Sequence, residues 1–354
     1  MKDTSSRPFR HVLTLIRGAK ASMRFDVRDP VAVIALCVVA AASPLPATAQ
    51  VLKGNLLVAN QEDASASLID LKSDSMRFIP VGIGPHEAAI SPSGRTGVVT
   101  IYGQRPPGNE LAIIDIASGT VERTISLGQY TRPHGVVFIP GDETRVVVTS
   151  ETTGNVVIVN IESGTVEAAI PTVAQGSHMA AITADGKRVF TSNVTSGSIS
   201  EIDLAERKFV RAIPVAPKVE GIAVTPDGKL VFAGSNTDGT VSIIDTGTGT
   251  IVGTLKGFKL PYRLAISADG RTALVCDPDG GAIHAIDVAT RAVAWTLDGL
   301  ASPRGVSIAP DGGTAFVTLA DDPSVGLVDM TAHKLVQTIT VGASPDGVGY
   351  GSAP

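Results

Sequence analysis

The sequence predicts an all-β protein, a seven-bladed β-propeller built from four-stranded antiparallel blades. Three observations lead to this fold class. A strand–turn–strand phrase such as VEGIAVTPDGKLVFA, at 219–233, returns along the chain at a near-constant spacing, and each repeat contains four short β-like runs. The two ends of the chain also carry complementary parts of one repeat. A period of about 40–45 residues with four strands per repeat is typical of a propeller blade.

The repeat is marked by the Asp that ends its third strand. Between Gly/Asp/Pro turns lie runs of β-branched residues, for example GIAVT, KLVFAG, TVSIID and TIVGTLK in the repeat from Lys218, which is the signal of short strands joined by hairpins. Packing each sheet between two neighbours in a ring buries both of its faces. Small residues such as Gly135, Gly221, Ala223 and Gly305 are expected where the first strands crowd near the axis. The markers are Asp70, Asp115, Asn160 in register, Asp203, Asp245, Asp287 and Asp329.

The ends of the repeat region predict how the ring closes. The first repeat, from Gly54, has a second, a third and a fourth strand but no first strand. The chain ends in SPDGVGYG, at 344–351, which reads as a first strand with nothing after it. We therefore expect the C-terminal strand to join the N-terminal blade. An open β-solenoid is the alternative, but it would not need complementary half-repeats.

The first 49 residues differ from the rest. After Met23 the sequence has a basic segment, an apolar run at 31–42 and an A-x-A site that ends at Ala49. These are the parts of a secretory signal peptide, so we expect translation to start at Met23, cleavage after Ala49, and one propeller over 50–354. A membrane anchor is the alternative, but a spanning helix needs about 20 apolar residues. The prediction is a periplasmic or secreted monomer with no transmembrane span after the signal.

The charge of the chain limits the kinds of partner that we expect, and its cysteine content limits the disulfides. Seven of the 29 basic and three of the 34 acidic residues precede Gln50, so the remaining chain has a net charge of −9. Such a surface repels polyanions in general, which argues against nucleic acid as a partner. Cys276 is the one cysteine after Gln50, so no intrachain disulfide is expected there, and we predict a buried thiol.

Degenerate repeat words suggest a family. The second strands read LLVAN at 56–60, FTSN at 190–193, FAGSN at 232–236 and FVTL at 316–319, and PDG turns occur at 226–228 and 310–312. The chain resembles the YVTN family of β-propeller repeat proteins over 54–351. This resemblance implies the propeller fold. It implies little about function, because the family includes cell-surface proteins, periplasmic proteins and a single-stranded-DNA binder.

The main candidates for function are the residues, one in each repeat, that come just before the first strand, which we expect to lie nearest the axis. Equivalent residues of successive blades form a ring around the mouth of the channel. Three histidines on consecutive blades, followed by a carboxylate, suit Zn or another divalent transition metal. The tentative metal ligands are therefore His86, His134, His178 and Glu220. The alternative is that the blades were copied from a parent repeat containing P-H-G and kept its histidine without binding a metal. The full ring is His86, His134, His178, Glu220, Tyr262, Arg304 and Asp346.

The opposite sector of the ring carries guanidinium groups. Tyr262, Arg263, Arg304 and Asp346 would suit a carboxylate or phosphate ligand. The alternative is a solvated rim in which Arg304 pairs with Asp346. Glu87 stands where most repeats have a small residue, which indicates a special role in that blade.

Three hypotheses for function follow. The first is a non-catalytic binding or scaffold protein that uses its channel-mouth face to hold another periplasmic protein or a small anionic ligand. The second is a metal-dependent hydrolase, lactonase or lyase-like enzyme with a His/Glu site in the funnel. The third is single-stranded nucleic-acid binding, which the charge and the 4% aromatic content disfavour. The sequence contains no G-x-S-x-G, H-E-x-x-H, P-loop or C-x-x-C motif.

Overall fold

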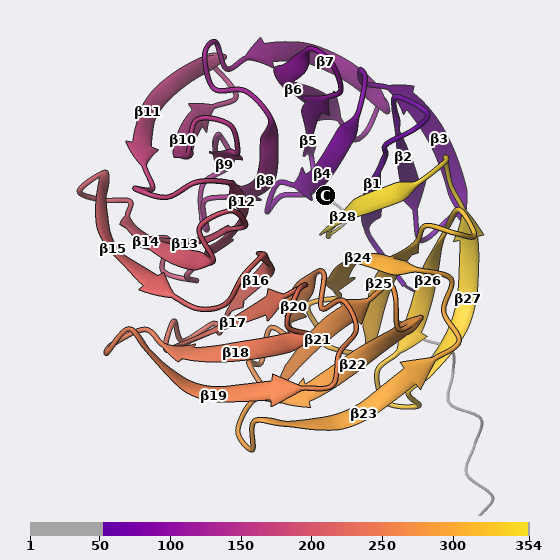
Figure 1. Ribbon diagram of the computed structural model, residues 1–354. Helices are drawn as coiled ribbons and strands as arrows, with labels where there is room; N and C mark the ends of the chain where they lie inside the picture. Colours follow the sequence, from indigo (N-terminus) through magenta and orange to yellow (C-terminus); the bar gives the residue numbers. More distant parts are fainter. Residues whose placement is uncertain (1–51, 353–354) are drawn as a thin grey trace, which may run out of the picture. The chain divides into compact units, whose positions relative to one another are not determined.

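Each repeat folds into one four-stranded antiparallel sheet, and seven such sheets surround a common axis (Figure 1). The computed structural model describes residues 52–352, which contain 28 strands. The predicted seven-bladed propeller is therefore confirmed. The expected start at Met23, the signal peptide and its cleavage after Ala49 lie outside the described residues. Within 52–352, no helix is long and apolar enough to cross a membrane.

The blades are numbered in chain order, and the strands of each blade are named from the innermost to the outermost. Blade 1 is β28 (Pro345–Gly351), β1 (Asn55–Asn60), β2 (Ser65–Asp70) and β3 (Ser75–Pro80). Blade 2 is β4 (Pro85–Ile90), β5 (Thr96–Gly103), β6 (Pro107–Asp115) and β7 (Thr120–Ser126). Blade 3 is β8 (Pro133–Phe138), β9 (Arg145–Ser150), β10 (Asn155–Asn160) and β11 (Thr165–Pro171). Blade 4 is β12 (Ser177–Ile182), β13 (Arg188–Asn193), β14 (Ser198–Asp203) and β15 (Lys208–Pro214).

The remaining blades follow the same order. Blade 5 is β16 (Val219–Val224), β17 (Leu230–Ser235), β18 (Thr240–Asp245) and β19 (Thr250–Lys256). Blade 6 is β20 (Leu264–Ile266), β21 (Thr272–Asp277), β22 (Ala282–Asp287) and β23 (Ala292–Asp298). Blade 7 is β24 (Pro303–Ile308), β25 (Thr314–Leu319), β26 (Ser324–Asp329) and β27 (Lys334–Thr340).

The C-terminal strand closes the ring as the half-repeats predicted. β28 pairs antiparallel with β1, with Asn55 opposite Gly351 and Leu57 opposite Gly349, so the yellow end of the chain lies beside its indigo start (Figure 1). The Tyr350 hydroxyl donates a hydrogen bond of 2.8 Å to the carbonyl of Lys53. An open solenoid is excluded, because the first and last repeats share one sheet.

Apolar side chains of neighbouring blades pack together to form the core. Phe232 of blade 5, for example, is fully buried in one cluster with Val275 of blade 6. At some positions near the axis, the backbones of neighbouring blades come so close that only glycine fits. A Cβ on Gly305 would lie 2.1 Å from the carbonyl oxygen of Asp346, and one on Gly221 would lie 2.3 Å from that of Tyr262. The small residues predicted on the first strands are thus required by the approach of the next blade.

Candidate functional site

Two rings of side chains meet at one end of the axis. Six of the seven inner strands begin one residue before the predicted ring position, whereas β20 begins only after Tyr262 and Arg263. In six blades, the backbone carbonyl just before the inner strand accepts a hydrogen bond from a residue at the end of the second strand. This residue directly follows the strand in five of them, and in blade 2 it is Tyr102, the last residue but one of β5. Tyr102 N–H bonds in this way to Gly84, and Glu151 N–H bonds to Arg132. A second ring is thereby brought level with the first, and we call the combined group the axial cluster: Gln61, His86, Glu87, Tyr102, His134, Glu151, His178, Glu220, Asn236, Arg263 and Asp346.

The three predicted histidines lie next to one another. His86 stacks on Tyr102 with ring centres 4.2 Å apart, and His134 meets His86 edge-on at 4.9 Å. The rings of His134 and His178 are 3.6 Å apart and tilted by 35°. Arg132 lies over the other side of Tyr102, 4.5 Å from the ring centre. Blades 2, 3 and 4 therefore share one continuous aromatic surface.

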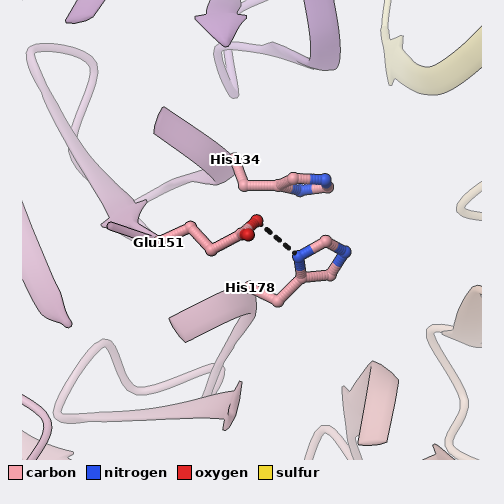
Figure 2. Close-up of side chains that lie close together, drawn as sticks. All are labelled: His134, Glu151 and His178. Atoms are coloured by element: carbon pink, nitrogen blue, oxygen red, sulfur yellow. Dashed lines mark hydrogen bonds and ion pairs between the residues drawn. The ribbon is translucent and has the colours of Figure 1, made fainter. Parts of the chain in front are cut away.

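His178 is held between two carboxylates. Its Nδ1 is 3.0 Å from Glu151 Oε2, and its Nε2 is 3.0 Å from Glu220 Oε1 (Figure 2 shows the bond to Glu151). Because a carboxylate only accepts hydrogen bonds, both ring nitrogens carry a proton and the ring is an imidazolium. Burial lowers the pKa of His178, but the bonds to Glu151 and Glu220 outweigh it, so that the pKa lies above its usual value. Burial raises the pKa of Glu220, and the bond from His178 and the charge of Arg263 reverse this to about 2.

His134 is the least satisfied member of the cluster. The residue is 2% exposed, and its Nδ1 has no hydrogen-bond partner. Burial, followed by the nearby charges of His178 and His86, holds its pKa well below the usual value, so the ring is neutral. Among residues 52–352, one group of ligating atoms lies within 4.8 Å of one another, and it consists of His134, Glu151 and His178 (Figure 2).

The other half of the cluster centres on Arg263, which is 3% exposed. Its Nε lies 2.9 Å from Glu87 Oε1 across the axis, and its Nη1 lies 3.2 Å from Glu220 Oε1. Asp346 Oδ2 is 4.0 Å from Nη2, so carboxylates of three other blades surround one guanidinium. Burial raises the pKa of the Glu87 carboxyl, and Arg263 offsets this in part. Glu87 and Arg263 replace the glycine of most other repeats, and each supplies the charge that the other needs.

Several predicted contacts differ from the structure. Arg304 does not pair with Asp346; it donates to Ser344 Oγ at 3.3 Å, while Asp346 Oδ2 accepts from Gln61 Nε2 at 2.6 Å. The metal-capable group contains Glu151 in place of His86 and Glu220. His86 is turned away from it, because its Nδ1 faces the Gly84 carbonyl at 3.3 Å and its Nε2 faces Gln61 at 3.2 Å.

Sequence reasoning missed the second ring. A signal for it exists: the residue that directly follows each second strand, or Tyr102 near the end of the longer β5, can be aligned across the repeats. This position is polar in blades 1, 2, 3 and 5, where its side chain joins the axial cluster. Tyr102 O–H donates to Glu151 Oε2 at 3.1 Å, and Asn236 Nδ2 donates to Glu220 Oε2. The aligned residues are Gln61, Tyr102, Glu151, Val194, Asn236, Pro278 and Ala320.

The fold and the cluster define a seven-bladed β-propeller with a buried, charged group of side chains on its axis. A solved structure similar to this chain is Kuenenia stuttgartiensis hydrazine synthase, with a TM-score of 0.67, 18% identity, and coverage of 75% of this chain and 89% of that chain. At this identity the likeness shows the fold alone. No protein-family model matches the chain, and no curated protein matches it. The resemblance to the YVTN family therefore stays a prediction.

Proposed function

We propose that this propeller is an exported, non-catalytic binding protein that holds a divalent transition metal such as Zn²⁺ on His134, Glu151 and His178. The observation that carries the proposal is His134, a buried neutral imidazole whose Nδ1 has no partner and which lies beside a second imidazole and a carboxylate. A buried nitrogen without a partner is costly unless a ligand satisfies it. Neutral imidazole and carboxylate are the donors that zinc prefers.

The spacing of the ligating atoms supports the same ion. At metal–ligand distances of about 2.0–2.2 Å, the ligating atoms of a tetrahedral site lie about 3.3–3.6 Å apart. His178 Nδ1 and Glu151 Oε2 are 3.0 Å apart, and all three atoms lie within 4.8 Å. Small side-chain shifts would therefore accommodate the ion. His178 must give up its Nδ1 proton to bind, so affinity should fall as the pH is lowered.

Binding rather than catalysis is proposed because the face around the cluster consists of loops on a stiff ring, which suits docking of another periplasmic protein or a small anionic ligand. One observation favours a second candidate, a metal-dependent hydrolase or lyase. Three protein ligands leave a coordination position open, as in catalytic zinc sites. A panel of lactone and ester substrates separates the two: turnover by the zinc-loaded protein that His134→Ala abolishes would establish the enzyme.

Zinc titration by calorimetry, with metal analysis of the same samples, tests the site. We expect one ion per chain in the wild type. His134→Ala and Glu151→Gln should each weaken binding by more than about 100-fold, which corresponds to about 2.7 kcal/mol. His333→Asn is the matched control, because it removes an exposed imidazole that stacks on Trp295, and asparagine tolerates the positive φ of 54° at that position. Equal affinity in all four proteins would disprove the metal site.

Export is part of the proposal and has its own test. Mass spectrometry of the protein recovered from the periplasm or the medium should find an N-terminus at Gln50. Recovery of the protein only in the cytoplasm, with Met1 or Met23 retained, would contradict export and leave the metal site untouched.

A further inference from the structure

One outer strand differs from the other six. In blades 2–7 the outer strand has seven residues and carries a β-bulge against its neighbour. β3 of blade 1 has six residues and pairs with β2 in unbroken register, from Asp70 opposite Ser75 to Ser65 opposite Pro80. The sequence shows the cause. Asp70 and His86 are 16 positions apart, whereas the corresponding marker and ring residue are 17 to 19 positions apart in the other repeats.

This difference leaves a regular open edge. A bulge leaves one residue unpaired and twists the strand, which hinders pairing with another chain. Just after β3, the Val81 N–H donates to the Ala64 carbonyl. Backbone groups alternate in direction along a strand, so every second residue counted back from Val81 directs its N–H and C=O groups to β2. Met76 and Phe78 lie at the alternate positions, so their N–H and C=O groups point outward, away from β2. Pro80 lacks an N–H and ends the ladder.

The two faces of this edge have different chemistry. On the side of blade 7, Met76 packs against the core, but Phe78 is 55% exposed. On the side of blade 2, Ser75 and Arg77 line a cavity of about 530 Å³ between blades 1 and 2. A strand added to β3 would therefore direct alternate side chains toward Phe78 and into this cavity.

The cavity favours acidic side chains. Three cationic residues line it, Lys72, Arg77 and Arg95. In the described residues, no ion pair involves any of the three. The carboxylates of Asp70 and Asp115 also line the cavity, but they accept turn N–H groups, from Lys72 at 2.8 Å and from Ser118 at 2.7 Å. Their charge is thus partly balanced within the turns. Arg77 Nη1 already donates to the carbonyl oxygens of Ala117 at 3.4 Å and Ser118 at 2.5 Å, whereas the side chains of Lys72 and Arg95 make no hydrogen bond to any described residue.

We propose that the β3 edge binds an extended strand of a partner protein by β-augmentation. Main-chain hydrogen bonds to Met76 and Phe78 hold the strand. Its apolar side chains pack on Phe78, and the alternate side chains are acidic and enter the cavity beside Lys72, Arg77 and Arg95. Such pairing takes its affinity from the main chain and its specificity from alternate side chains. This surface is separate from the axial cluster and does not depend on the proposed metal site.

The test is fluorescence anisotropy with an eight-residue peptide that alternates Asp and Val, added to the purified protein. A Lys–Val peptide of the same length is the charge control, and it should bind at least about tenfold more weakly. Phe78→Pro removes an outward N–H without removing a bond to β2, and should weaken Asp–Val binding by at least about tenfold. Phe78→Ala keeps the N–H and should cost less than Phe78→Pro. Thermal unfolding checks that both variants fold.

A second pair of variants tests the charge. Arg95→Ala should weaken binding by about threefold to tenfold, and NaCl at about 0.5 M should reduce the difference. Arg271→Ala is the matched control, because Arg271 holds the equivalent backbone position between blades 5 and 6, with its carbonyl bonded to Val288 N–H as that of Arg95 is to Ile116 N–H. It should leave binding unchanged.

Three results would overturn the proposal. One is no saturable binding of the Asp–Val peptide up to about 1 mM. Another is equal binding by the wild type and a folded Phe78→Pro variant. The third is a dimer of this chain that Phe78→Pro dissociates, since the edge would then be occupied by a second copy.

Discussion

Replacing Arg263 with methionine should strongly destabilise the propeller. The guanidinium is 3% exposed, lies 2.9 Å from Glu87 and 3.2 Å from Glu220, and faces Asp346 at 4.0 Å. At an effective dielectric constant of about 20, two unit charges 2.9 Å apart attract by about 6 kcal/mol, and desolvation offsets much of this. Removing one partner leaves the other charge buried and unpaired, which costs about 3–5 kcal/mol.

Urea denaturation and thermal unfolding would measure the effect. For a chain of this size each kcal/mol lowers Tm by about 2 °C, so Arg263→Met should melt about 6–10 °C below the wild type. A double variant adds Glu87→Gln to Arg263→Met. The added substitution removes the charge of Glu87, which Arg263→Met alone leaves without its partner across the axis. The double variant should therefore be more stable than the sum of the single effects predicts, by about 2 kcal/mol. Additive effects, or a Tm change below about 1 °C for Arg263→Met, would refute a cross-axis ion pair.

Three further predictions follow. The raised pKa of His178 means that its contribution to stability is complete below its unfolded pKa of about 6.5 and is lost as the pH rises through the folded value. Glu220→Gln removes one of the two carboxylates that bond to His178, so NMR titration should find a lower His178 pKa. Urea titrations should then show that the stability contributed by His178 begins to be lost at a lower pH. An unchanged His178 pKa would contradict the pairing. Gly305→Ala should cost about 2–4 kcal/mol, because the new Cβ would lie 2.1 Å from the Asp346 carbonyl, whereas Gly313→Ala, with its nearest contact at 3.4 Å, should change stability by less than about 0.5 kcal/mol. The Cys276 thiol is buried and its pKa is raised by desolvation, so thiol reagents should label it only after unfolding, as mass spectrometry can check.

The three histidines show how identical residues at equivalent positions acquire different chemistry. His86 bonds to Gly84 and Gln61, and His178 is clamped by Glu151 and Glu220, while His134 Nδ1 has no partner. The repeat alone supplies the imidazole. Its surroundings come from neighbouring blades: Gln61 of blade 1 for His86, and Glu151 of blade 3 with Glu220 of blade 5 for His178. The repeat thus accounts for the equivalent positions of the three histidines, but not for why one is charged and another neutral.

Much of the fold could be predicted because the interactions that build a blade are local in sequence. Alternating β-branched runs, PDG turns and Asp markers specify four strands within about 42 residues, and the same pattern recurs in every repeat. Even the closure by β28 was visible, since half a repeat at each end leaves one sheet to complete. The missing residue between Asp70 and His86 was visible as well, although its consequence, a regular β3 edge, requires knowledge of the bulges in the other blades.

The sequence by itself determined the seven sheets, the glycine-lined axis and the level at which His86, His134 and His178 stand. The tertiary structure alone decided which side chains meet across blades: Glu151 with His178, Gln61 with Asp346, and Arg263 with Glu87 from the far side of the axis. The physical reason is that a repeat fixes the position of a residue along its own blade, whereas contacts at the axis depend on side-chain length and charge across the ring. Those contacts join residues up to 285 positions apart, and no local pattern in the chain records them.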